Sequence, residues 1–224
     1  MRKVLMRNLY KHPNDPRWFL CADLHLDHPD ILIHNPITRP FKTLDDMHSF
    51  IVDGWNSTVR RNDFVVIVGD FAFRNVEKWA KLLCGKKYLI KGDHDSINQD
   101  NEKLFLKVCD NLRKTIFGRR IFFHHFPCLT WPDRYEGGSH IHGHSHGRTE
   151  ENEYDRRIDV SMDAWGLRVI PIEIIFEKLD SKKPLPPMTD RERCEREERK
   201  RLLIRGNLNL LKIYDESIGK TKEK

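Results

Sequence analysis

The chain has 224 residues, 38% of them apolar and 33% charged, which is enough for one sizeable domain and an appendage. Its net charge of +6 favours phosphate-bearing partners but specifies no reaction. The five cysteines are scattered without a C-x-x-C pair, which excludes a zinc knuckle and a disulfide framework. No apolar run suits a signal peptide or a membrane span, so we expect a soluble cytoplasmic protein that contacts no membrane.

Predicted strands and helices alternate along the first part of the chain. In order, they are a strand at 17–23, a helix at 43–59, a strand at 63–70, a helix at 75–85 and a strand at 86–95. Thr43 is the expected N-cap of the first helix, and Gly85 ends the second. This alternation predicts an α/β layered domain.

The second part of the chain predicts one more helix and several strands. They are a helix at 99–110, two strands that pair across the turn at 117–120, and strands at 156–166 and 168–176. We therefore expect a domain over residues 1–178, a Pro-rich linker over 179–190 and a charged helical extension over 191–224. Thr189 and Glu192 have the spacing of a capping box. Packing of this helix on the domain or on a partner is the favoured interpretation, and a nucleic-acid-binding arm is the alternative.

Carboxylates and histidines gather where the predicted strands end. They are Asp23 and His25, then Asp70, then Asp93, His94 and Asp95, then His124 and His125, and finally His140, His142, His144 and His146. Ligands of α/β sheets bind outside the carboxyl ends of the strands, so we expect these groups to converge on one edge.

The mixture of carboxylates and imidazoles predicts a two-metal hydrolase. Such ligands suit Mn²⁺, Fe, Zn²⁺ or Ni²⁺ better than Ca²⁺, and Mn²⁺ is our first expectation. Two divalent ions can share a bridging hydroxide as nucleophile and hold both oxygens of an in-line displacement. Asp70 is the expected bridging carboxylate because it ends a central strand.

Five ordered motifs resemble those of the calcineurin-like metallophosphoesterases. They are "DLH" at 23–25, "GDF" at 69–71, "GDHD" at 92–95, "HHFP" at 124–127 and "GHSH" at 143–146. The segments "RPF", "MHSFIVDGWN" and "VGDFAF" also resemble a small single-domain bacterial and phage branch. The resemblance covers roughly residues 17–176. It implies two facing mixed β-sheets flanked by helices, with a dinuclear site at one end.

The resemblance also implies a role for each motif residue. One metal ion would be bound by Asp23, His25, Asp70 and His146, and the other by Asp70, Asp93, His125 and His144. His125 is preferred to His124 because the family motif commonly reads H-[YF]-P. His94 would be the general acid, and Asp95 would orient its imidazole. His140 and His142 would lie outside the metal ligands, on the strand that leads to Gly143.

Asp93 departs from the family pattern, which usually has asparagine there. Three carboxylates against two divalent ions leave a charge of +1 instead of +2 before any hydroxide is counted. We expect this lower charge to disfavour a dianionic monoester more than a monoanionic diester. A tolerated variant and an activity-lowering substitution are the alternatives.

Three further side chains are candidates for substrate contacts. Arg74 has the spacing of a phosphate-binding arginine, with a surface ion pair as the alternative, and Arg39 and His28 could line the site. Trp131 is either a base-stacking platform or, as we prefer, a loop aromatic that packs under its own segment.

Together these features predict an enzyme, a dinuclear phosphoesterase with a slight preference for phosphodiester or nucleotide-type substrates. The alternatives are a metal-dependent nuclease on DNA or RNA, and a non-catalytic metal-binding scaffold that presents the C-terminal helix. The sequence does not distinguish phosphodiesterase from phosphatase activity and does not set the oligomeric state.

Overall fold

The structure, a computed structural model, describes residues 9–150, 152–183 and 190–219. The chain divides into two units, residues 1–184 and 185–224. In the described part of the chain, no helix combines the length and the apolar character needed to cross a membrane.

The first sheet of the N-terminal unit is mostly parallel, with strand order β4-β3-β2-β1-β9. Its strands are β1 (Trp18–Cys21), β2 (Phe64–Val68), β3 (Lys86–Ile90), β4 (Lys107–Cys109) and β9 (Ile170–Pro171). Only β9 is antiparallel to its neighbour. The carboxyl ends of β1, β2 and β3 therefore meet at one edge of the sheet.

The second sheet has the order β5-β6-β7-β8 and is mixed. Its strands are β5 (Asn111–Ile116), β6 (Arg119–His124), β7 (Ser139–His142) and β8 (Arg157–Asp159). The predicted hairpin across residues 117–120 is confirmed as the antiparallel β5–β6 pair, while β6, β7 and β8 are parallel.

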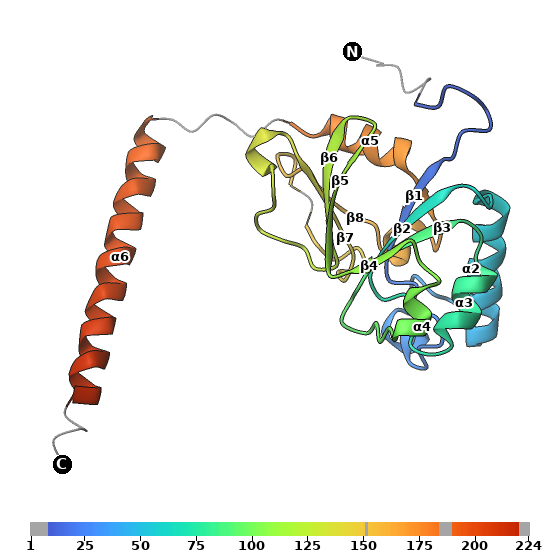
Figure 1. The fold of residues 1–224 in the computed structure, drawn as a ribbon, viewed down its shortest axis with the longest axis horizontal. Coiled ribbons are helices and arrows are strands. Elements are labelled where there is room, and N and C mark those ends of the chain that lie inside the picture. Colours follow the sequence, from blue (N-terminus) through green and yellow to red (C-terminus); the bar gives the residue numbers. More distant parts are fainter. Residues whose placement is uncertain (1–8, 151, 184–189, 220–224) are drawn as a thin grey trace. The chain divides into compact units, whose positions relative to one another are not determined.

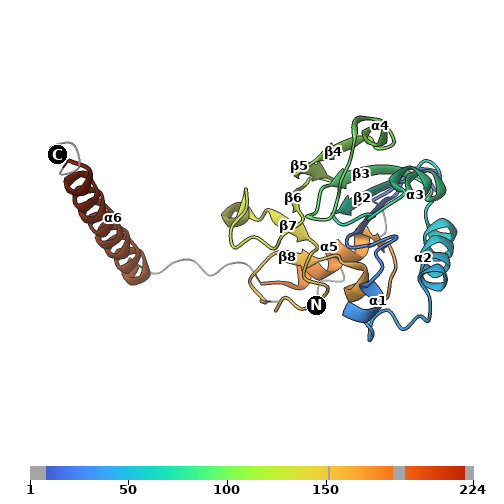
Figure 2. The ribbon, with the colours of Figure 1, turned by 90° about the horizontal axis from the view of Figure 1, so that it is seen from below.

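Successive side chains along each strand of the first sheet point to opposite faces, so they pack in two separate hydrophobic cores. Phe19 and Val65 pack with residues of α2 (Leu44–Thr58) and α3 (Val76–Leu82). Leu20 and Val66 on the opposite face pack against the second sheet and α5 (Ile172–Ser181). Figures 1 and 2 show α2 and α3 on the side of the first sheet away from β5–β8. Two facing mixed sheets flanked by helices confirm the predicted fold class.

Helix α2 begins as its sequence predicts. The Thr43 side chain accepts a hydrogen bond from the backbone N–H of Asp46 at 3.2 Å, which satisfies one free donor of the first turn. The short helix α1 (Ile31–His34) precedes it.

Three predicted elements differ from the structure, and the first two are a helix and a strand. In place of one helix over 99–110, α4 (Gln99–Glu102) is short and residues 107–109 form β4, because pairing with β3 outweighs local helical preference. In place of a strand over 168–176, only β9 pairs with β1, and α5 follows. The buried side chains of α5 are Ile172, Ile175, Phe176 and Leu179, which is the i, i+3, i+4, i+7 pattern of a helix.

Residues 156–166 form the short strand β8 and then a 3₁₀ helix, Met162–Trp165, instead of one continuous strand. Helix α5 extends to Ser181, inside the segment that was expected to be linker. Residues 184–189, with the predicted cap Thr189, lie outside the described residues. The C-terminal unit contains α6 (Asp190–Gly219), on which Leu202, Leu203, Ile204 and Leu208 are exposed.

Candidate metal centre

The predicted ligands lie in loops that directly follow strand ends. Asp23 follows β1, Asp70 follows β2 and Asp93 follows β3, three neighbouring parallel strands. Several of these residues adopt a left-handed backbone, which is uncommon for residues with a side chain and concentrates at functional sites. They are Asp23 (φ 57°), His25 (φ 51°), Asp70 (φ 54°), His144 (φ 66°) and His146 (φ 49°).

Two glycines leave the space that the carboxylates occupy. A Cβ atom on Gly143 would lie 2.4 Å from Asp23 Oδ2, and one on Gly92 would lie 2.1 Å from Asp70 Oδ1. Any larger residue at either position would displace a ligand carboxylate.

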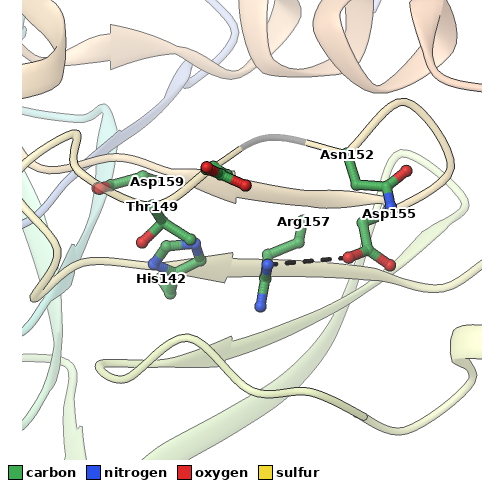
Figure 3. Close-up of a pocket in the computed structure, with 7 residues that line it drawn as sticks. His142, Thr149, Asn152, Asp155, Arg157 and Asp159 are labelled. Carbon is green, nitrogen blue, oxygen red and sulfur yellow. Dashed lines mark ion pairs between the residues drawn. The ribbon is translucent and has the colours of Figure 1, made fainter.

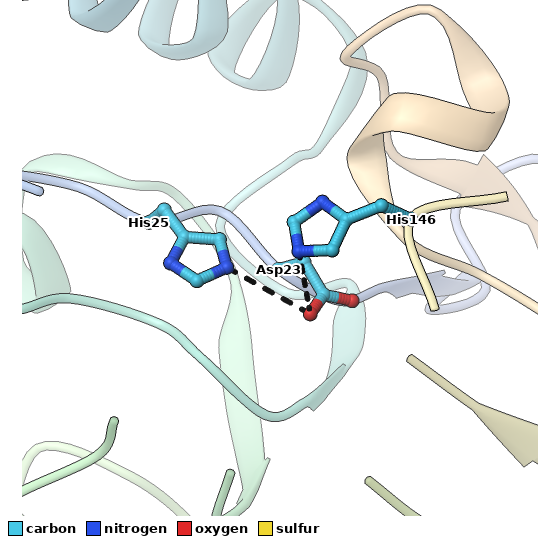
Figure 4. A group of neighbouring side chains, drawn as sticks. All are labelled: Asp23, His25 and His146. Carbon is cyan, nitrogen blue, oxygen red and sulfur yellow. Dashed lines mark ion pairs between the residues drawn. The ribbon is translucent and has the colours of Figure 1, made fainter. Parts of the chain in front are cut away.

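Asp23, His25 and His146 form a first group of ligands (Figure 4). The ligand atoms of this group all lie within 4.8 Å of one another. Asp23 Oδ1 is 3.9 Å from His25 Nε2 and 3.7 Å from His146 Nε2. Asp23 and His25 are buried, and His146 is nearly so.

Asp93, His125 and His144 form a second group of the same dimensions. His125 Nε2 is 3.1 Å and His144 Nδ1 is 3.6 Å from Asp93 Oδ1. Asp70 lies between the two groups, since its Oδ2 is 3.5 Å from both His25 Nε2 and His125 Nε2. The structure thus brings all seven predicted ligands together and places Asp70 between the two groups.

The electrostatics of the two groups fit divalent cations. Neither ring nitrogen of His25 has a hydrogen-bond partner among the described residues, and burial lowers the pKa of this imidazole to about 2, so it is neutral. Burial raises the pKa of Asp23 to about 7. An unpaired neutral imidazole beside a buried carboxylate is a costly arrangement that a metal ion would relieve.

Asp70 and His125 are strongly coupled. Burial alone would raise the pKa of Asp70, but the hydrogen bond and charge of His125 outweigh it and lower that pKa to about 2. Burial would lower the pKa of His125, but Asp70 raises it to about 9. The two shifts share one cause, because each group stabilises the charged form of the other.

Asp163 orients His146 and was not identified from the sequence. His146 Nδ1 donates to Asp163 Oδ2 at 2.6 Å, which leaves Nε2 free for a metal ion. Burial alone would raise the pKa of Asp163, but the bonds from His146 and Arg39 hold it below its usual range. Asp163 occurs in no recognised motif and lies within a segment that was predicted as a strand, so no sequence signal marked it.

Arg39 does not line the site, which corrects the expected substrate contact. Its guanidinium is buried, and Nη2 lies 2.7 Å from Asp163 Oδ2. The same nitrogen donates to the backbone oxygen of Asp23 at 2.6 Å, and Nη1 donates to that of Leu24 at 3.0 Å. Arg39 therefore holds the ligand loop and Asp163 in place, and no donor of this side chain is exposed to a substrate.

Asp95 also has a role other than the predicted one. Its carboxylate accepts backbone N–H bonds from Asp70 and Phe71, both at 2.8 Å, and from Gly92 at 2.9 Å. No contact among the described residues joins Asp95 to the His94 imidazole. Asp95 therefore fixes the loop of the bridging carboxylate and does not orient His94.

His94 lies at the exposed side of the centre. Its backbone N–H donates to Asp70 Oδ1 at 3.1 Å, and its Nε2 lies 3.9 Å from Asp93 Oδ2. The ring centroid is 4.8 Å from that of Phe73, and the half-buried His28 ring lies 6.0 Å from His94. His28 thus lies beside His94, and its contact with a substrate stays a prediction.

Arg74 is exposed and forms no ion pair within the described part of the chain, so its guanidinium is available to a ligand.

Trp131 is buried and donates from Nε1 to the Gly138 oxygen at 3.0 Å. It packs under its own segment, the interpretation that we preferred.

The remaining histidines lie outside both groups. His124 accepts a bond from the backbone N–H of Phe126 at 3.2 Å and belongs to neither group. His140 and His142 are buried in β7. His142 lines a different pocket with Asp155, Arg157 and Asp159 (Figure 3).

Comparison with known proteins bears on the fold. No family model matches the chain. Uncharacterized protein MJ1445 of Methanocaldococcus jannaschii is 25% identical over 182 residues, 77% of this chain and 96% of that protein. The protein of unknown function AQ665 from Aquifex aeolicus superposes with a TM-score of 0.58 at 22% identity, covering 73% of this chain and 100% of that one. YfcE, a phosphoesterase from E. coli, has a TM-score of 0.36 at 15% identity, covering 69% and 81% of the two chains.

In its motifs and in its fold, the chain resembles the calcineurin-like metallophosphoesterases. The superposition on AQ665 shows a shared fold and carries no activity with it.

Proposed function

We propose that the protein is a dinuclear metal-dependent phosphoesterase of the cytoplasm. The position of Asp70, with one carboxylate oxygen 3.5 Å from a histidine of each ligand group, carries this proposal. Two divalent ions, Mn²⁺ in the first instance, would be held by Asp23, His25 and His146 on one side and by Asp93, His125 and His144 on the other. Asp70 would be shared between them.

When bound, such ions neutralise phosphate charge and lower the pKa of water. The chain's own residues supply the remaining functions. Asp95 fixes the backbone of Asp70 through N–H bonds. His94 reaches solvent beside the second group, where its ring can donate a proton to the leaving oxygen. Arg74 and His28 are the side chains available to bind the phosphate.

Hydrolysis of a chromogenic phosphodiester by the metal-stripped protein, with each transition metal added back, tests this function. We expect turnover with Mn²⁺ and loss of both bound metal and turnover in Asp70→Asn. Asp100→Asn, at an exposed carboxylate paired with Lys103, is the matched control and should change neither. A protein that stays inert with every metal, and whose Asp70→Asn variant keeps its metal content, contradicts the proposal.

A panel of phosphomonoesters, diesters, cyclic nucleotides and RNA, run with each metal, separates the alternatives. A nuclease would show a steep salt dependence of binding to nucleic acid. Two bound metal ions without turnover of any substrate would indicate a non-catalytic scaffold.

The carboxylate of Asp93 gives a prediction about substrate charge. Because Asp93 reduces the net charge of the loaded centre, Asp93→Asn should shift the ratio of diester to monoester kcat/KM toward monoesters, by about tenfold. The ratio is measured with the aryl diester and the aryl monoester of one leaving group, at matched metal content. An unchanged ratio would rule out the charge explanation.

A further inference from the structure

The two ligand groups differ in their exposure to solvent. In the first group, the side chains of Asp23, His25 and His146 are 0%, 4% and 13% exposed. In the second group, His125 is buried, but the side chains of Asp93 and His144 are each 43% exposed. Two of the three ligands on the second side can therefore change rotamer at little cost to packing.

A buried ion pair supports only the first group. Arg39 and Asp163 have fully buried side chains and lie 2.7 Å apart. Through Asp163 this pair fixes the ring of His146, and through the 2.6 Å bond to the Asp23 oxygen it fixes the backbone of a second ligand. One guanidinium thus preorganises two of the three ligands of this group, which lowers the entropy lost when a metal ion binds.

The second group has less support. Backbone bonding fixes His125, since its Nδ1 donates to the Val68 oxygen at 2.9 Å. The His144 backbone N–H donates to the buried Asp23 carboxylate at 3.0 Å, which fixes its loop. Its ring packs on the partly exposed Phe126 at 4.5 Å, and the described polar contact of the ring is with Asp93 at 3.6 Å. Among the described residues, no fully buried carboxylate bonds to the ring of His144 as Asp163 bonds to that of His146, and Asp93 lies 3.1 Å from the ring of His125.

We propose that the chain holds its two metal ions unequally, and that the Arg39–Asp163 pair causes the difference. The group of Asp23, His25 and His146 retains one divalent ion, while the group of Asp93, His125 and His144 binds the second ion reversibly. This inference rests on the proposed dinuclear function. It makes the free concentration of the second ion a regulator of turnover, because only the doubly loaded protein is complete.

Titration of the metal-stripped full chain with MnCl₂ tests the proposal, with heat and the electron paramagnetic resonance of free Mn²⁺ as readouts. We expect two binding events whose Kd values differ by at least about tenfold. His144→Ala should remove the weak event and leave the tight one, and His146→Ala should remove the tight event. Two events of equal affinity, or loss of the tight event in His144→Ala, would overturn the inference while leaving the dinuclear function intact. No binding at all would overturn both.

Asp163→Asn tests the positioning role. It should raise the Kd of the tight event by about 10–100-fold and leave the weak event within about threefold. Its matched control is Asp63→Asn, at another buried carboxylate that is paired with Arg17 and Arg60 and contacts no ligand. Both variants should lower the thermal unfolding midpoint, but only Asp163→Asn should change metal affinity. A loss of stability in Asp163→Asn without a change in Kd would show that the pair is merely structural.

Discussion

Two pairs of histidines lie next to each other in the segment 140–146 and behave differently. His140 and His142 belong to β7, where they are buried and bond to backbone oxygens. His144 and His146 follow the strand with left-handed φ angles of 66° and 49° and contribute to the two ligand groups. The difference teaches that alternation in a sequence does not make residues equivalent, because the end of a strand changes where its side chains point.

The largest expected effect is a loss of activity when a histidine of the second pair, but not of the first, is replaced. His146→Ala removes a proposed metal ligand and should lower kcat/KM for a phosphodiester by about 1,000-fold, equivalent to roughly 4 kcal/mol. His142→Ala should reduce stability but leave metal content unchanged, because this ring belongs to neither group. Metal content and kcat/KM of the folded fractions are the measurements. Loss of metal in His140→Ala but not in His146→Ala would reverse the assignment.

Gly143, which separates the two pairs, gives the next effect. Gly143→Ala would place a Cβ atom 2.4 Å from Asp23 Oδ2 and 2.5 Å from Ala22 Cβ, and should destabilise the fold by about 3 kcal/mol. Its backbone lies outside the left-handed region, so lack of space is the cause. Gly118→Ala is the control for backbone strain without crowding, because Gly118 has a φ of +76° and no atom within 4 Å of an added Cβ. It should lower the free energy of unfolding by about 1 kcal/mol. Equal shifts of the two thermal midpoints would contradict the crowding at Gly143.

The smallest effect concerns His140 and pH. Burial lowers the pKa of His140 from its ordinary 6.5 to about 3, and the ring stays neutral while it accepts from the Cys128 N–H at 3.1 Å. The unfolded chain binds this proton below pH 6.5 and the folded chain does not, so stability falls as the pH falls from 6.5 toward 3.

Between pH 7 and pH 5, His140 should account for a loss of about 2 kcal/mol in the free energy of unfolding. Urea unfolding of His140→Leu should show a pH dependence that is flatter by this amount, while the exposed His12→Gln should keep the original dependence. A His140→Leu variant with the wild-type pH dependence would show that the ring is not held neutral.

The ligands could be predicted because each carboxylate comes directly after a strand that the sequence itself indicates. Asp23, Asp70 and Asp93 each follow a strand with a clear apolar pattern, and parallel pairing then places them at one edge. The preference for His125 over His124 came instead from the resemblance of "HFP" to the family motif.

Features that depend on tertiary contacts could not be predicted. Arg39 and Asp163 are 124 residues apart, and neither carries a pattern that indicates their pairing. Asp95 was assigned to the adjacent His94, but the backbone N–H groups of Asp70 and Phe71 compete for its carboxylate and hold it. The apolar spacing of α5 was present in the sequence, but the β-branched Val169, Ile170 and Ile172 at the start of this segment favour a strand.

The long sequence separation between Arg39 and Asp163 has a consequence for biosynthesis. A nascent chain that has reached residue 150 already contains all seven proposed ligands, yet it lacks the carboxylate that orients His146 and the strand β9 that pairs with β1. Since domains fold as units while the chain emerges from its N-terminus, the ligand loops cannot reach their final arrangement before Asp163 has been added. A truncated product of translation would therefore carry the metal-binding motifs without a finished binding site.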